Sequence, residues 1–121
     1  MITVPADKLL RLGQDIYQAH GLSEDRAKFL TETLIEASLT GHDSHGVFYF
    51  VTYSERLKEG HIVPNANPII AQETPSTALI DGQYAPGQIT AMKLTEIAVE
   101  KAKGQMVSAV GAFRCNHIGR L

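Results

Sequence analysis

Residues 69–81 read Ile-Ile-Ala-Gln-Glu-Thr-Pro-Ser-Thr-Ala-Leu-Ile-Asp, two short apolar runs on either side of Thr-Pro-Ser. Runs of this length that flank a turn signal are typical of paired strands, so we predict a β-hairpin with strands at 69–73 and 77–81. The hairpin separates a first half with helical periodicity from a second half that combines a helix with a strand. The sequence therefore predicts an α+β fold.

Three helices are predicted before the hairpin, because apolar residues recur there at three- and four-residue spacing. The apolar faces are Leu9, Leu12, Ile16 and Ala19; Ala27, Leu30, Leu34 and Ala37; and Val47, Phe50 or Val51, and Leu57. Start and stop signals bound each helix. These signals are Pro5 and Gly21 for the first, Ser23 and Gly41 for the second, and Asp43 or Ser44 with Gly60 for the third.

After the hairpin we predict a loop at 82–87, a helix from Ile89 to Lys103 stopped by Gly104, and a strand at 106–113. The small apolar residues of that strand indicate burial on both faces, which requires neighbours on both sides. The chain supplies at most the hairpin. We therefore expect a single fragment over 1–121, with a helical region at 1–60 and a truncated α/β portion at 61–121; the resemblance given below implies that it is N-terminal.

Composition excludes several classes of function. The 121 residues suffice for one domain, and the net charge is -2 with scattered Lys and Arg, so neither a nucleic-acid surface nor a polybasic membrane patch is present. The N-terminus lacks the basic and apolar regions of a signal peptide, and no apolar run reaches the ~20 residues that span a bilayer. A single cysteine fits a reducing compartment. We expect a cytoplasmic protein.

The first chemical motif is Gly41-His42-Asp43-Ser44-His45-Gly46. If Asp43 or Ser44 caps the third helix, His45 lies in its first turn, where backbone N–H groups favour an anion and disfavour the imidazolium form. A neutral imidazole suits proton transfer in carbonyl–alcohol interconversion, and Ser44 or Asp43 would orient the ring. On spacing alone, the plainer interpretation of a helix cap with an exposed histidine stays open.

The second motif, Asn116-His117-Ile118-Gly119, follows the final strand. Polar loops after strands often carry active-site groups in α/β proteins, and His117 is a candidate acid or base. A plain strand-to-helix turn capped by Asn116 is the alternative.

Other features are weaker signals. The segment 82–88 lacks the spacing of a phosphate loop and is interpreted as a structural turn. Cys115 is interpreted as a small buried filler, and Tyr49 and Tyr53 as core residues that could also line a cleft. His42 and His45 have no set of partner ligands, so we predict no metal site.

The order of these motifs resembles the N-terminal third of the malate/L-lactate dehydrogenase family, whose NAD(P)-dependent 2-hydroxyacid oxidoreductases are unrelated to the Rossmann-type enzymes. The resemblance covers essentially the whole chain. It rests on Gly41–Gly46, Tyr53–Gly60, Ala78–Gly82 with Gly87-Gln88, Ala98–Ala102, and Asn116–Arg120.

The resemblance implies hydride transfer between NAD or NADP and a 2-hydroxy or 2-oxo acid, in a homodimer of a non-Rossmann α/β fold. It implies His45 as catalytic residue with Ser44 as partner, and His117 as co-catalyst or rival. Further implied contacts are Tyr49, Tyr53, Asn116 and Arg120 to substrate, and His45, His117 and Gly119 to cofactor.

One position departs from the family pattern. Many members carry arginine four residues after the first motif's histidine, suited to a substrate carboxylate, where this chain has Tyr49. This favours the hydroxycarboxylate-dehydrogenase branch, and the pair Phe48 and Tyr49 suggests a bulkier 2-oxo acid. Because the family chain is about three times longer and its main cofactor-binding segments lie downstream, we expect these 121 residues alone to be inactive. The alternative function is a non-catalytic helical module that binds a small anion or mediates dimerisation.

Overall fold

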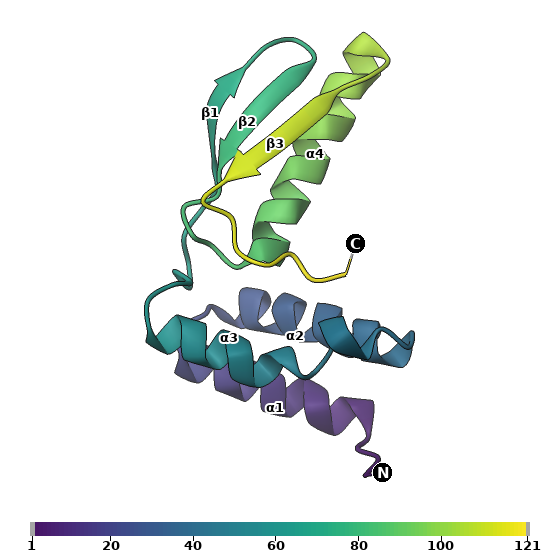
Figure 1. Ribbon diagram of the computed structural model, residues 1–121, viewed down its shortest axis with the longest axis vertical. Coiled ribbons are helices and arrows are strands. Elements are labelled where there is room, and N and C mark those ends of the chain that lie inside the picture. The colour runs from purple at the N-terminus through teal and green to yellow at the C-terminus, as the bar shows by residue number, and fades with distance from the viewer. Residues whose placement is uncertain (1, 121) are drawn as a thin grey trace. The chain divides into compact units, whose positions relative to one another are not determined.

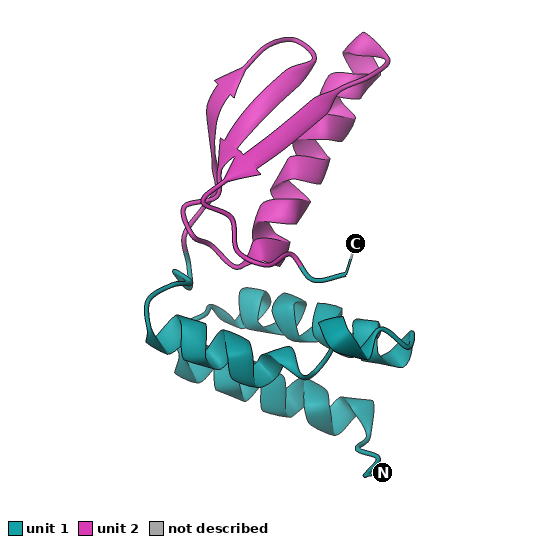
Figure 2. Cartoon of the chain, viewed as in Figure 1, with its two compact units in different colours: residues 1–65, 119–121 teal, residues 66–118 magenta. Residues whose placement is uncertain are grey.

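The computed structural model describes residues 2–120, which form two compact units (Figures 1 and 2). Unit 1 comprises residues up to Asn65 together with Gly119 and Arg120, and unit 2 comprises Ala66–Ile118. The elements are four α-helices and a three-stranded sheet, so the predicted α+β class is confirmed.

Unit 1 is helical, and its three α-helices confirm the predicted number. They are α1 (Ala6–Ala19), α2 (Glu24–Leu39) and α3 (Tyr49–Lys58), with a short 3₁₀ turn, η1 (Asp43–His45), between the last two. Ser23 precedes α2 as expected, although its side chain makes no capping hydrogen bond.

The core of unit 1 is built mainly from α2 and two tyrosines. The predicted face of α2 is confirmed, because Ala27, Leu30, Leu34 and Ala37 are all buried. In α1 the prediction was partly wrong: Leu12 is 51% exposed and Ala19 is also exposed. The buried residues of α1 are Gly13 and Tyr17, and the Tyr17 ring meets Phe50 edge to face at 5.9 Å. The face of α1 that packs in the core is therefore the one that carries Gly13 and Tyr17, because the large tyrosine ring is buried there.

The third helix begins later than predicted. The backbone of η1 closes with hydrogen bonds from His45 to His42 and from Gly46 to Asp43, three residues apart. Gly46 then leaves the helical conformation, with φ -98° and ψ -145°, and α3 begins at Tyr49. His45 is therefore not in the first turn of an α-helix. Val51 is 64% exposed, so of the two alternatives for the apolar face of α3 it is Phe50 that packs in the core.

Unit 2 contains β1 (Ile69–Glu73), β2 (Thr77–Asp81), α4 (Gly87–Gln105) and β3 (Ala109–Phe113). The predicted hairpin is confirmed residue for residue. The sheet order is β1-β2-β3, with β1 antiparallel to β2 and β2 parallel to β3, and α4 packs against the sheet (Figure 1). The helix continues past Gly104, where a stop was predicted, and Met106 takes the left-handed conformation at its end.

The prediction that the last strand is buried on both faces is wrong for this chain. Residues of β3 alternate between exposed and half-buried. Within residues 2–120 the strand pairs with β2 alone, so its other edge has no neighbouring strand.

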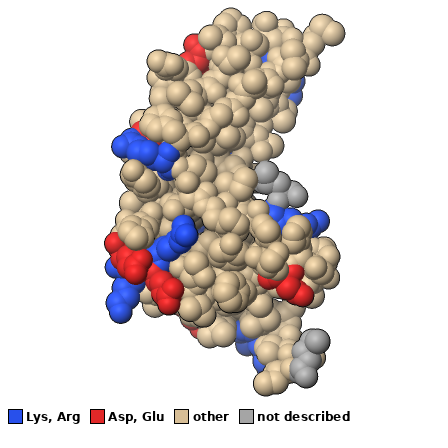
Figure 3. Space-filling view, in the orientation of Figure 1, with Lys and Arg blue, Asp and Glu red and all other residues tan. Residues whose placement is uncertain are grey.

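The surface carries charges of both signs. On the face shown in Figure 3, acidic and basic side chains lie near one another rather than in separate patches. Within residues 2–120 no helix has the length and apolarity needed to cross a bilayer.

Candidate functional site

The turn that carries the first histidine motif is fixed at the end of α2. Gly41 has φ +79° and donates its N–H to the Ser38 carbonyl at 3.1 Å, while His42 N–H donates to Ala37 at 2.8 Å. This pair of bonds is the Schellman arrangement, in which glycine in the left-handed conformation ends a helix. The predicted role of Gly41 as a helix stop is thus confirmed.

Within this turn Ser44 and His45 lie together. The Ser44 hydroxyl oxygen is 3.0 Å from Nδ1 of His45, and the His42 ring lies 4.6 Å from the His45 ring, centroid to centroid. Ser44 is exposed and His45 is half-buried. A hydrogen bond at one ring nitrogen orients an imidazole and selects its tautomer. No α-helix N-terminus acts on His45, because η1 is a 3₁₀ turn only three residues long.

Ser38 holds the far side of the same turn. Its hydroxyl accepts a hydrogen bond from Val47 N–H at 3.1 Å. Gly46 is buried against Ser38 so closely that a Cβ at position 46 would collide with the serine side chain. The two glycines of the motif therefore serve the local fold, one as helix stop and one as close contact.

Other predicted residues of unit 1 lie nearby. Tyr49 is half-buried with its ring 5.1 Å from that of Tyr53, and Tyr53 is a core residue with 2% of its surface exposed. Arg120 is exposed, and its Nη1 donates to the Thr40 hydroxyl at 2.9 Å, which places it at the residue directly before Gly41. Sequence reasoning did not identify Thr40 as a contact of Arg120.

Residues 116–118 of the second motif lie in unit 2 and pack on the loop that precedes α4. Nδ2 of Asn116 donates to the backbone carbonyls of Tyr84 at 2.9 Å and Ala85 at 3.0 Å. Gly87 lies against the carbonyl of His117, where a Cβ would collide with it. His117 itself is half-buried. The loop at 82–87 therefore supports the histidine segment, in agreement with its interpretation as a structural turn.

Asp81 and Arg114 are the residues that sequence reasoning missed. Nε of Arg114 donates to Oδ1 of Asp81 at 2.8 Å, and Nη2 donates to Oδ2, so the pair is bidentate. Asp81 is 5% exposed. The Arg114 hydrogen bond holds the pKa of Asp81 below its usual value, while the carboxylate raises the pKa of Arg114. The sequence held no signal for this pair, because the two residues share one end of the sheet only through the parallel direction of β2 and β3.

Cys115 was interpreted as a buried filler, but the residue is exposed. Its thiol donates to the Asn116 carbonyl at 3.2 Å, and partial burial raises the pKa of the thiol. A raised pKa disfavours the thiolate, which is the nucleophilic form of cysteine.

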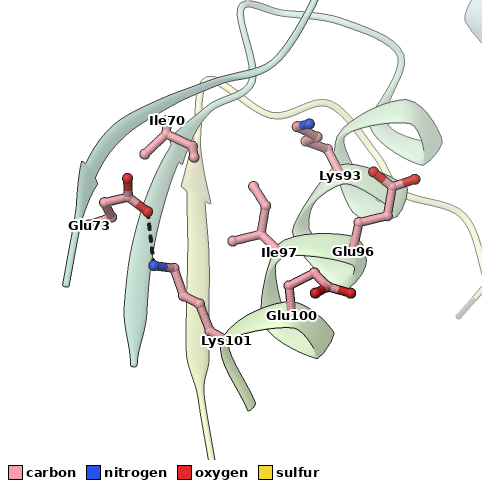
Figure 4. A pocket seen from close by; sticks show the side chains of 7 residues that line it. All are labelled: Ile70, Glu73, Lys93, Glu96, Ile97, Glu100 and Lys101. Atoms are coloured by element: carbon pink, nitrogen blue, oxygen red, sulfur yellow. Dashed lines mark hydrogen bonds and ion pairs between the residues drawn. The ribbon is translucent and has the colours of Figure 1, made fainter. Parts of the chain in front are cut away.

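A groove of about 480 Å³ lies on unit 2 between β1 and α4 (Figure 4). It is lined by Ile70, Glu73, Lys93, Glu96, Ile97, Glu100 and Lys101. Lys101 bonds Glu73 at 2.9 Å across the groove, and the lining contains none of the predicted site residues. Among the described residues, no group of three or more histidines, cysteines and carboxylates is placed to hold a metal ion.

Known proteins resemble this chain over nearly its whole length. A family model described as malate/L-lactate dehydrogenase matches residues 4–121. The malate/(S)-sulfolactate dehydrogenase of Methanothermus fervidus is 41% identical over 104 residues, which are 86% of this chain and 31% of that protein. Hydroxycarboxylate dehydrogenase B of Escherichia coli K12 is 32% identical over 108 residues, 89% of this chain and 30% of that protein.

Solved structures also match this chain over nearly its whole length. The sulfolactate dehydrogenase from Methanocaldococcus jannaschii superposes with a TM-score of 0.91 at 34% identity, over 98% of this chain and 34% of that one. Malate dehydrogenase from Pyrococcus horikoshii gives 0.90 at 32% identity, over 98% of this chain and 34% of that one. The chain thus spans about a third of the length of the relatives it matches and corresponds to an N-terminal piece of them.

Proposed function

Because the chain belongs to the malate/L-lactate dehydrogenase family, we propose that it carries the proton-transfer part of a dehydrogenase acting on 2-hydroxy and 2-oxo carboxylic acids. The observation that carries the proposal is the hydrogen bond between Ser44 and Nδ1 of His45, in a turn fastened to α2. The names of the relatives, which include malate, sulfolactate and hydroxycarboxylate dehydrogenases, support the class of substrate.

In the proposed reaction His45 takes the proton of the substrate hydroxyl during oxidation and returns it during reduction. The Ser44 hydroxyl orients the imidazole, so that its proton-exchanging nitrogen presents a constant geometry to the substrate. When bound, NAD or NADP accepts or supplies the hydride at the carbon that bears the hydroxyl. His117 is the second proton-transfer candidate and the alternative to His45.

We propose the substrate contacts from two properties of each side chain: its exposure to solvent and the hydrogen-bond donors that it can offer. Arg120 is exposed, and its guanidinium has donors beyond the one that Thr40 accepts, so it suits a carboxylate. Half-buried Tyr49 contributes an aromatic surface for the substrate side chain. Asn116 is better suited to positioning, because both hydrogens of its amide are matched by backbone carbonyls. Tyr53 packs in the core of unit 1 with 2% of its surface exposed, so we propose no substrate contact for it.

We propose that two residues of this chain, Gly119 and His117, contact part of the dinucleotide. Gly119, with φ +77°, provides side-chain-free backbone, and the imidazole of His117 provides a polar partner. The loop at 82–87 is assigned no phosphate, because the backbone N–H groups of Gln83, Tyr84 and Ala85 already donate within the chain, to Asp81, Arg114 and Gly82.

We propose further that the protein is a homodimer. Large apolar side chains near the histidine turn support this, since Phe48 is 72% and Val51 is 64% exposed. Exposed apolar patches of this kind commonly mark interfaces. Light scattering across a concentration series tests the proposal, and a monomer at every concentration contradicts it. The small-anion module loses its physical support, because its anion site required His45 at the start of an α-helix.

A chimera tests the main proposal. Residues of this chain replace the matched N-terminal piece of the Methanothermus fervidus enzyme, which is 41% identical to it. Malate and (S)-sulfolactate are supplied with NAD or NADP, and formation of the reduced nicotinamide is followed by absorbance. Turnover supports the proposal. A chimera that is folded by circular dichroism and has no activity with either substrate, while the parent enzyme is active, refutes it.

A further inference from the structure

Two loops of unit 2 are joined directly after the ends of β2 and β3. Gly82 N–H donates to the Phe113 carbonyl at 2.9 Å, and Tyr84 N–H donates to the Arg114 carbonyl at 3.0 Å. A Cβ at Gly82 would lie 2.7 Å from the Arg114 carbonyl oxygen, so only glycine permits this approach. The segment that leaves β3 toward His117 therefore runs along the loop that leaves β2.

The backbone at this junction is strained. Arg114 has φ +48°, and Gln83 and Tyr84 have φ +53° and +56°. Met106 is the only other non-glycine residue with positive φ among residues 2–120. L-residues avoid this region because of contacts with Cβ, and such conformations persist only where surrounding interactions fix them. Three strained residues at one junction call for a specific restraint.

Asp81 supplies the restraint. Its carboxylate, 5% exposed, accepts both hydrogen bonds of the Arg114 guanidinium and also accepts from Gln83, through the backbone N–H at 3.0 Å and through Nε2. The Arg114 guanidinium also lies 5.7 Å from the centres of the Tyr84 and Phe113 rings. One carboxylate thus holds residues from both loops, and a bidentate pair fixes direction as well as distance.

The direction of the chain after Arg114 decides where His117 lies. A left-handed residue turns the backbone sharply, and His117 follows three positions later. If Arg114 relaxed to a right-handed conformation, Asn116 would lose its bonds to Tyr84 and Ala85, and the His117 carbonyl would leave Gly87. The geometry of the histidine segment therefore depends on a contact that does not include the histidine.

We propose that Asp81 and Arg114 are positioning residues, whose ion pair holds Arg114 in the left-handed conformation and thereby orients the segment that carries His117. The inference deepens the proposed function and rests on it for the catalytic value of that orientation. The orientation itself is measurable without cofactor or substrate.

The test uses the 121-residue chain labelled at its five histidines, with each imidazole titrated by NMR. In Asp81→Asn, which is nearly isosteric, we expect the titration midpoint of His117 to move by at least ~0.3 pH units, with the other four histidines unchanged. Glu73→Gln is the matched control, because it removes an exposed ion pair of the same unit. If His117 moves no more in Asp81→Asn than in this control, the proposal is overturned.

A second variant separates positioning from general support of the fold. Glycine adopts the left-handed conformation without help, so the double variant Asp81→Asn with Arg114→Gly should return the His117 midpoint toward the wild-type value, whereas Asp81→Asn with Arg114→Ala, which removes the same two charges, should not. A double variant as displaced as Asp81→Asn overturns the proposal that Arg114 is the link. If Asp81→Asn unfolds, Arg114→Lys carries the test, since it keeps the charge and loses the bidentate geometry. A negative NMR result would refute the positioning role of Asp81 and Arg114. An inactive chimera would instead refute the proposed dehydrogenase function, so the two failures are distinguishable.

Discussion

The hydroxyl oxygen of Ser44 lies 3.0 Å from Nδ1 of His45, in a turn whose two ends are both tied to α2. Neither Ser44 nor His45 belongs to the first turn of an α-helix, because α3 begins only at Tyr49. The Schellman bonds of Gly41 and the close contact of Gly46 with Ser38 fix the turn instead. The position of this proposed proton-transfer pair therefore depends on the contacts of its turn with α2.

His45→Ala in the chimera is expected to lower kcat at least ~100-fold, the usual contribution of a general acid or base. Ser44→Ala should cost less, about 10-fold, because the imidazole remains but loses its orientation. His61→Ala serves as control, since its imidazole is exposed at the end of unit 1 and outside the motif. Initial rates at saturating substrate measure the effect. Near-normal turnover in His45→Ala would move the catalytic role to His117.

Two helical glycines should respond oppositely to alanine. At Gly13 in α1 a Cβ would lie 2.8 Å from the Phe50 ring and overlap Thr31, so we expect Gly13→Ala to lower the free energy of unfolding by ~1–3 kcal/mol. At Gly104 in α4 a Cβ would meet nothing within 4 Å, so Gly104→Ala should raise it by up to ~1 kcal/mol. Urea titration of both variants gives the comparison, and equal signs would contradict the packing described for α1.

Two leucines of α2 provide a matched pair for the core. Leu30 is fully buried, so Leu30→Ala should lower the free energy of unfolding by ~2–5 kcal/mol through lost burial and a cavity. Leu39 is 72% exposed, and Leu39→Ala should change it by no more than ~0.5 kcal/mol. Chemical denaturation of the 121-residue chain measures both. A large effect at Leu39 in the monomer would show that this side chain is covered.

The stability of unit 2 should depend on pH through Asp81. Its pKa is lowered in the folded state, chiefly by the Arg114 hydrogen bond. Such a carboxyl stabilises the fold fully above its unfolded pKa of about 4, and the contribution is lost as the pH falls through the lower folded pKa. We expect the free energy of unfolding to decline below pH ~4, and Asp81→Asn to be less stable near neutrality with a flatter acid decline. Parallel declines in both proteins would exclude Asp81 as the source.

Much of the fold was predictable because local patterns determine it. Thr-Pro-Ser between two apolar runs fixed the hairpin, and the Leu30 and Leu34 spacing identified the buried face of α2. The start of α3 was predicted wrongly, because the contact of Gly46 with Ser38 is made between residues eight positions apart and outweighs the capping tendency of Asp43 and Ser44. Periodicity also misjudged α1, where Tyr17 packs against aromatic rings of α3.

In the candidate site, too, contacts between sequence neighbours were predictable and contacts between distant residues were not. Ser44 and His45 are neighbours in sequence, so their pairing could be foreseen. Arg120 and Thr40, or Asp81 and Arg114, are paired only through the folded chain. The sequence did not give the relative direction of β2 and β3. An antiparallel arrangement would have placed Asp81 and Arg114 at opposite ends of the two strands.

The parallel pairing of β2 and β3 has a consequence for the order of folding. Their paired residues lie about thirty positions apart with all of α4 between them, whereas the helices of unit 1 follow one another through short turns. During synthesis Asp81 leaves the ribosome well before Arg114, and its carboxylate stays in water until α4 has reversed the chain. We expect pulse-labelled amides of α1 and α2 to gain protection before those of β3. The ion pair that orients the histidine segment is thus among the last contacts of the chain to form.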